Sequence, residues 1–205
     1  MEKRQLTPND LEAGRAKIFH MILFAMAWVM IGEYGIHFRD YAAAAGIVLI
    51  SVVLLGLQSI QLYDLESELQ APLGESVSEA GQRRRRFRLN VTIFIFEGAA
   101  IMATWMILLR QGRTDWLVPG FALIAGLHFI PLAIVSHLSS YYLLGVWICL
   151  LAVIGYLLPG WGSSDVAWSN ALIAYGCAAG AIADGVGVVS GIKKKISRER
   201  RSRLT

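Results

Sequence analysis

Charged residues are scarce in this sequence, and long stretches of the chain have none. Asp, Glu, Lys and Arg make up 17% of the 205 residues, and 56% of the residues are hydrophobic. Soluble domains carry about 25% charged residues. The charges are also clustered, so the stretches between them are apolar and long enough to cross a bilayer, which takes roughly 20 residues as a helix. The composition therefore predicts a multi-pass membrane protein, and the length requires one domain only.

Several motifs of known chemistry are also absent. Two cysteines, Cys149 and Cys177, both lie in apolar runs and are expected to be packing residues rather than a disulfide framework. No Cys/His spacing is typical of a zinc site, and no glycine-rich phosphate loop follows a strand. The motifs Gly-x-Ser-Gly and His-Glu-x-x-His, expected of an intramembrane protease, do not occur. These absences argue against an enzyme without excluding one, and neither a cofactor nor a metal is expected.

Six apolar runs predict an all-α bundle of six transmembrane helices within residues 18–190. The predicted spans are 18–36, 41–63, 89–109, 116–136, 140–158 and 167–190. The remaining parts are an N-terminal segment 1–17, one sizeable loop 64–88, and a basic tail 191–205 that is expected to be frayed or disordered. The fourth and fifth runs are separated by only a few residues around Leu138, so these two helices should be antiparallel neighbours.

The distribution of Lys and Arg predicts how the chain is oriented. Of the 19 such residues, all but Arg39, Arg110 and Arg113 fall in the N-terminal segment, the 64–88 loop or the tail. Because cytoplasmic segments are enriched in Lys and Arg, both termini and this loop are expected in the cytoplasm. The first apolar run is too long for the core of a cleaved signal peptide. The expected location is the inner or plasma membrane of a bacterium.

Three ionisable side chains interrupt the apolar runs at a similar depth. His128 lies close to the helix-kinking Pro131, and Glu97 and Asp184 interrupt two other runs. From a helix rise of about 1.5 Å per residue, we expect Glu97 and His128 about 12 Å, and Asp184 about 10 Å, from the cytoplasmic ends of their helices. An ionised side chain at the membrane centre costs roughly 2.5–3.5 kcal/mol. Three such groups at one depth should therefore pair with each other or contact water.

Polar and small residues extend this pattern. Asn90 lies two helical turns before Glu97, which places both on one face of the third span. Gln58 lies nearer the cytoplasmic end of the second span. The glycines that share the helix face of Asp184 are Gly180, Gly187 and Gly191. Small residues at such spacing let helices approach closely, so these glycines predict a helix–helix contact. Glu33, toward the outer end of the first span, is expected to be hydrated.

These features together predict a small transporter or channel for protons, small ions or solutes. Histidine changes charge near neutral pH, and a neighbouring carboxylate can act as its counter-charge or proton partner. The residues expected to form this relay are Glu97, His128, Asp184, Asn90 and Gln58, with Pro131 as a hinge. The alternative is a non-catalytic scaffold or regulatory subunit in which the same groups only fix helix packing.

Three further interpretations stay open at this stage. The set Glu97, His128 and Asp184 could bind zinc, manganese or iron, although no local motif supports a metal site. Haem could be ligated by a histidine. The third helix of each half carries an acid followed by glycine, at Glu97-Gly98 and at Asp184-Gly185, which would suit an inverted repeat.

The expected partners are lipids. The bilayer surrounds the spans, and basic segments are attracted to anionic lipid headgroups by about 1 kcal/mol per charge near the surface. The basic residues expected to do so are Arg83, Arg84, Arg85, Arg86 and those of the tail. Nucleic acid is not an expected partner, and a homo-oligomer is left open.

Overall fold

The computed structural model describes residues 8–35, 53, 57, 77–158 and 166–204. These residues are helical apart from short turns, and no strand occurs among them. The helices are α1 (Pro8–Gly35), α4 (Val77–Arg110), the 3-10 turn η2 (Thr114–Trp116), α5 (Leu117–Ser136), α6 (Ser140–Leu157) and α7 (Val166–Leu204). Five of them are long and apolar enough to cross a membrane. The all-helical fold predicted from the sequence is thus confirmed for the described residues, and its five long helices are consistent with a membrane protein.

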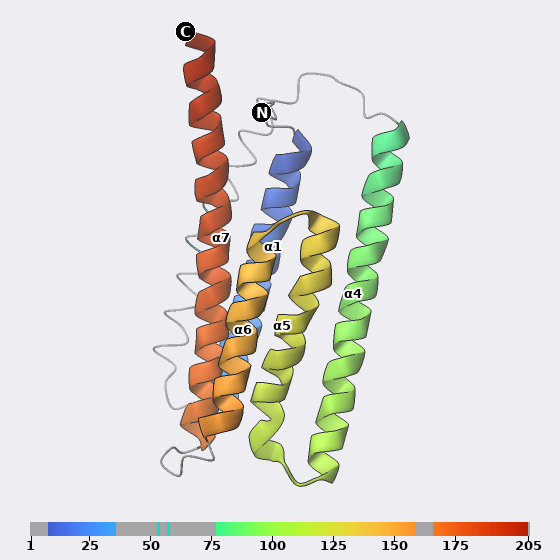
Figure 1. The fold of residues 1–205 in the computed structure, drawn as a ribbon, viewed down its shortest axis with the longest axis vertical. Helices are drawn as coiled ribbons and strands as arrows, with labels where there is room; N and C mark the ends of the chain where they lie inside the picture. Colours follow the sequence, from blue (N-terminus) through green and yellow to red (C-terminus); the bar gives the residue numbers. More distant parts are fainter. Residues whose placement is uncertain (1–7, 36–52, 54–56, 58–76, 159–165, 205) are drawn as a thin grey trace.

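The five long helices overlap with five of the six predicted spans. The remaining predicted span, 41–63, is the second in chain order. It lies outside the described residues except for Val53 and Leu57. Figure 1 shows that α1 ends at the opposite end of the bundle from the point where α4 begins, as an intervening span would require. The number of spans is not tested by the described part of the chain, so six remains a prediction.

The helices run roughly along one axis (Figure 1). The main packing partners are α1 with α7 and α5 with α6, while α4 packs chiefly on α5. A connection of three residues, in which His137 adopts a left-handed conformation with φ 54°, reverses the chain between α5 and α6. These two helices are therefore the antiparallel neighbours that the short connection predicts.

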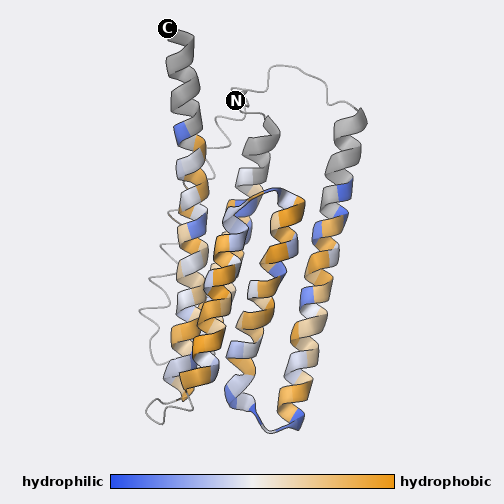
Figure 2. Ribbon diagram, viewed as in Figure 1, coloured by the Kyte–Doolittle hydropathy of each residue, from blue (hydrophilic) through white to orange (hydrophobic). Residues whose placement is uncertain are grey.

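One end of the bundle collects basic residues, and we call it the basic end. α1 and α4 begin there, and α7 ends there (Figure 1). Figure 2 shows apolar residues along the middle of the helices and hydrophilic residues toward this end and at the turns. The exposed side chains of Arg85, Arg88 and Lys194 lie on these parts of α4 and α7. Which side of a membrane the basic end faces remains a prediction.

Three helices extend beyond their predicted spans, and the first is α1, which begins at Pro8 within the N-terminal segment 1–17. α4 begins at Val77, within the expected 64–88 loop, and α7 continues through the tail to Leu204. The expectation of a frayed tail is therefore wrong. Once a helix has formed, each added residue contributes one hydrogen bond without a new nucleation cost. The Lys, Arg and Glu residues of the tail also have high helix propensity, so their polarity does not end the helix.

Glycines allow α5 and α6 to pack at very short range. A Cβ atom placed on Gly126 would lie 3.0 Å from the carbonyl oxygen of Gly145 and 2.5 Å from Cys149 Sγ. Neither helix could keep its position if residue 126 carried a side chain, since the nearest atoms include backbone. Close approach at small residues is a major source of helix association within membranes.

The three glycines predicted to line a contact on α7 differ in their surroundings. A Cβ on Gly180 would lie 2.6 Å from Trp147 Cδ1 of α6, and Trp147 Nε1 donates a 3.0 Å hydrogen bond to the Gly176 carbonyl. Gly180 thus makes room for an indole ring. No described atom lies within 4 Å of a Cβ built on Gly187 or Gly191, so their packing role stays a prediction. α5 also continues through Pro131, whose hinge role stays a prediction.

Candidate functional site

Four helices bring ionisable side chains together in the half of the bundle nearer its basic end. These side chains form two ion pairs with a histidine between them. The residues are Lys17 and His20 of α1, Glu97 of α4, His128 of α5 and Asp184 of α7. We call this set the ionisable layer.

The first pair joins α4 to α5. His128 Nδ1 lies 3.0 Å from Glu97 Oε1, and the side chains are only 5% and 13% exposed. The contact is an ion pair when the imidazole carries a second proton. The two atoms are not aligned for a hydrogen bond, and neither ring nitrogen of His128 has another partner in the described residues. Both are buried polar atoms, which normally find a partner, so this histidine is available to a water, proton or ligand.

The second pair joins the first described helix to the last. Lys17 Nζ lies 2.6 Å from Asp184 Oδ2, and the two side chains are 1% and 8% exposed. Lys17 also donates a hydrogen bond to Ser140 Oγ, and its ammonium lies 3.9 Å from the centre of the Tyr141 ring. A buried ammonium with a carboxylate, a hydroxyl and an aromatic face around it is well compensated for its lost hydration.

His20 lies between the two pairs. It is on the same face of α1 as Lys17, one turn further along. Its ring centre lies 6.4 Å from that of His128 and 5.1 Å from that of Phe94. The layer therefore runs from Asp184 through Lys17, His20 and His128 to Glu97, across the bundle rather than along it.

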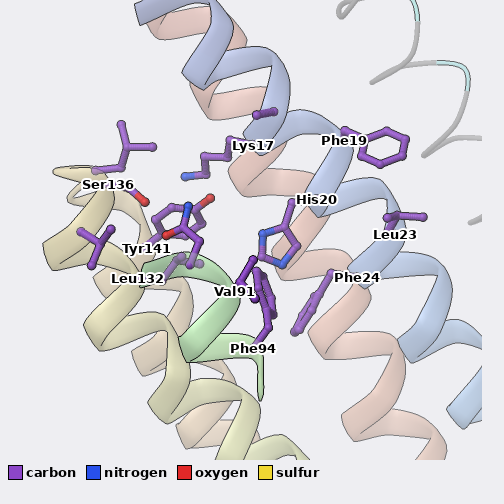
Figure 3. Close-up of a pocket in the computed structure, with 14 residues that line it drawn as sticks. Lys17, Phe19, His20, Leu23, Phe24, Val91, Phe94, Leu132, Ser136 and Tyr141 are labelled. Atoms are coloured by element: carbon purple, nitrogen blue, oxygen red, sulfur yellow. The ribbon is translucent and has the colours of Figure 1, made fainter. Parts of the chain in front are cut away.

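A cavity of about 650 Å³, open on one side, adjoins this layer, and its lining residues Phe19, Leu23 and Phe94 are exposed. It lies among α1, α4, the end of α5 and the beginning of α6, and Figure 3 shows the Lys17 and His20 side chains at it. Its polar lining residues are Lys17, His20, Asn90, Ser136 and Tyr141, and the remainder are largely apolar or aromatic. Asn90 Oδ1 is buried and has no hydrogen-bond partner in the described structure. The cavity thus has a polar side and an apolar side.

The structure brings together some of the residues of the sequence-based site. Glu97 and His128 lie in contact, and Asn90 lies at the adjoining cavity. Asp184, however, pairs with Lys17 rather than with His128. Gln58 lies outside the described residues.

Sequence reasoning missed the contribution of Lys17, which was counted only as a cytoplasmic charge. Its position relative to His20 was the available signal, since residues three apart share a helix face. The roles of Ser140 and Tyr141 carried no such signal, because they depend on where α6 begins relative to α1.

A separate polar contact lies toward the opposite end of the α1–α7 interface. Tyr175 of α7 donates a hydrogen bond to Glu33 Oε1, and Glu33 is only 2% exposed. The expectation that Glu33 is hydrated is therefore wrong, because α7 covers it. Its second oxygen, Oε2, has no hydrogen-bond partner among the described residues.

The described residues contain no group of three or more His, Cys, Asp or Glu side chains arranged to hold a metal. The metal site considered from Glu97, His128 and Asp184 is not assembled, since Lys17 is the partner of Asp184. Comparisons with protein-family models, with curated proteins and with solved structures found no match for this chain. Its function is therefore argued from the ionisable layer and the adjoining cavity.

Proposed function

We propose that this protein is a small membrane transporter that uses the ionisable layer to move protons or small ions and solutes. The observation that carries the proposal is the convergence of five ionisable side chains from four apolar helices beside a cavity. Each charged group within a membrane costs several kcal/mol unless it is paired or hydrated. Groups of this kind in transmembrane helices commonly mark proton or substrate pathways.

The proton is the simplest cargo for this arrangement. Glu97, His128, His20, Lys17 and Asp184 follow one another across the layer. A histidine can accept a proton at one ring nitrogen and release one from the other, which suits it to proton transfer near neutral pH. His128 and Glu97 attract each other most strongly when the imidazole is protonated and the carboxylate is not.

The position of α4 links this chemistry to movement. Few residues of α4 are buried, and among the described helices it packs chiefly on α5. The Glu97–His128 pair is thus a polar contact across a lightly packed interface. Losing the proton from His128 removes the charge attraction between α4 and α5. A helix held by such a pair can change its position with each protonation cycle, as alternating access requires.

A scaffold is the second candidate function, and it also has an observation in its favour. Each ion pair links two different helices, α4 to α5 and α1 to α7. Buried pairs of this kind can specify which helices are neighbours without any transport. The two functions differ in what an amide replacement does, because an amide retains hydrogen bonding and cannot exchange a proton at ordinary pH.

Proton flux in reconstituted vesicles tests the proposal. Purified protein is placed in vesicles that contain a pH-sensitive dye, and an imposed pH gradient is followed in time. We expect wild type to dissipate the gradient faster than empty vesicles, and Glu97→Gln to insert and fold normally but lose this flux. Asp115→Asn, an acid-to-amide change at η2 outside the layer, serves as the matched control. Absence of wild-type flux, with Glu97→Gln as stable as wild type, would favour the scaffold.

A further inference from the structure

The cavity beside the ionisable layer has the size and lining of a small-molecule site. Its volume of about 650 Å³ falls within the roughly 300–1,000 Å³ of such sites. Phe24 and Phe94 present aromatic rings to it, and Leu132 adds an aliphatic side chain. A few polar groups converge on one side of an apolar cavity, which is the usual design for fixing the orientation of an organic ligand.

The charge of the lining selects the sign of the ligand. Lys17 and His20 line the cavity, whereas no Asp or Glu is among its described lining residues. The two acids of the layer are each paired with a base, Asp184 with Lys17 and Glu97 with His128. A cationic ligand would therefore meet an ammonium group first. An anionic ligand would instead meet hydrogen-bond donors on Lys17 and His20.

We propose that this cavity binds an organic carboxylate with an apolar body, and that its carboxylate shares or takes over Lys17 from Asp184. The apolar body packs against the phenylalanine rings, and Asn90, Ser136 and Tyr141 supply further hydrogen-bonding groups at the polar side. The inference rests on the proposed transport function for its biological meaning, because it names the solute. The binding itself is measured without transport.

Binding of such an anion is coupled to one proton. Two ionised carboxylates beside a single ammonium repel each other, so arrival of the ligand favours protonation of Asp184. Other ionisable groups around Lys17 are Tyr141 on α6 and His20 on α1, with His128 on α5 beyond His20. The proton is taken up from the aqueous solution when the ligand binds, and the Lys17 ammonium keeps its charge throughout. Anion and proton together leave the layer with unchanged net charge.

Three matched compounds test the sign of the ligand. 3-Phenylpropionate, 3-phenylpropanol and 3-phenylpropylamine share one apolar body and differ only in charge at neutral pH. Calorimetric titration of the full-length protein in lipid nanodiscs, with empty nanodiscs subtracted, measures each affinity. We expect the carboxylate to bind at least about tenfold more tightly than the alcohol or the amine. Laurate is titrated alongside. If laurate binds more tightly than 3-phenylpropionate, the ligand of the site is a membrane-borne fatty acid rather than a soluble aromatic acid.

Variants test the place of binding. Val91 lines the cavity on α4 and belongs to neither ion pair, so Val91→Trp fills the cavity with all four paired residues retained and should weaken 3-phenylpropionate binding about tenfold or more. Ile95→Trp is the matched control, because Ile95 is exposed on the same helix and is not one of the lining residues. Lys17→Gln combined with Asp184→Asn removes the pair without leaving an unpaired charge, and it should abolish the preference for the carboxylate over the alcohol.

The number of protons taken up on binding tests whether the ligand carboxylate takes over Lys17 from Asp184. Titration in two buffers of different ionisation enthalpy measures the protons taken up with each anion. We expect about one in wild type and none in Asp184→Asn, whose affinity for the anion should rise about tenfold because the competing carboxylate is gone. Equal binding of the three compounds, no binding of the carboxylate, or no effect of Val91→Trp overturns the site. Carboxylate binding without proton flux in vesicles would leave the site standing and refute transport.

Discussion

Lys17 on the first described helix and Asp184 on the last meet with 2.6 Å between Nζ and Oδ2, and both side chains are almost inaccessible. Lysines near the end of a membrane helix usually extend outward to the interface, where the ammonium stays hydrated. Here the ammonium is held in the protein by Asp184, Ser140 and the Tyr141 ring. The pair therefore makes the α1–α7 contact depend on a charge balance as well as on packing.

The first prediction concerns that balance. Lys17→Met leaves a buried carboxylate without its counter-charge and should reduce the free energy of unfolding by about 3–5 kcal/mol. Lys17→Met combined with Asp184→Leu removes both charges and should recover most of that loss. Unfolding in mixed detergent micelles, monitored by tryptophan fluorescence, measures both. Lys194→Met, at an exposed position on α7, controls for loss of a basic residue. If the double variant loses as much free energy of unfolding as the two single changes added together, the two charges do not depend on each other.

The second prediction concerns the α5–α6 contact. Gly126→Ala places a Cβ 2.5 Å from Cys149 Sγ and 3.0 Å from Gly145 O, so the helices must separate. The expected cost is about 1–3 kcal/mol, as for other overpacked sites. Gly98→Ala on α4 makes the same chemical change where no described atom lies within 4 Å, and it should be nearly neutral. Similar thermal stabilities for the two variants in detergent would contradict the close contact.

The third prediction concerns Glu33 and Tyr175. Tyr175→Phe removes the hydroxyl that donates to Glu33 Oε1 and leaves a buried carboxyl with one partner fewer. The expected loss of stability is about 1–3 kcal/mol, which is typical for a buried group deprived of its hydrogen bond. Adding Glu33→Met to Tyr175→Phe should cost little more, because the group that lacked a partner is then absent. Thermal unfolding of the two single variants and the double variant gives the coupling, and a value near zero would show that the bond does not stabilise the fold.

The fourth prediction concerns orientation. Ser78 lies near the start of α4 at the basic end, and Gln111 lies in the turn after α4 at the opposite end. If the basic end is cytoplasmic, a cysteine at position 111 should react with an impermeant maleimide in intact cells. A cysteine at position 78 should react only after the membrane is opened. Both are made with Cys149 and Cys177 replaced by alanine. The reverse pattern would invert the predicted topology.

The residues of the site show how far sequence reasoning reached. Depth along each helix follows from position, so Glu97 and His128 were expected at a similar level, and they are in contact. The depth of a residue along its own helix does not identify the helix that packs beside it. Asp184 was expected to pair within the set of Glu97 and His128 or to contact water, whereas Lys17 reaches it with a long side chain from the neighbouring helix α1. An estimate made from backbone positions misplaces a lysine charge by the length of its side chain.

The sequence alone determined that this protein forms long apolar helices, because helix formation in such runs depends on local properties. In lipid, each backbone polar group needs a hydrogen bond within its own segment, so an apolar run of sufficient length becomes a helix whatever surrounds it. Only the tertiary structure decided the partners: Lys17 with Asp184, Tyr175 with Glu33, and Gly126 against Gly145. Apolar side chains face lipid and protein with nearly equal ease, so hydropathy leaves the choice of neighbours open. Small residues and a few buried polar contacts make that choice, and they act between segments far apart in the chain.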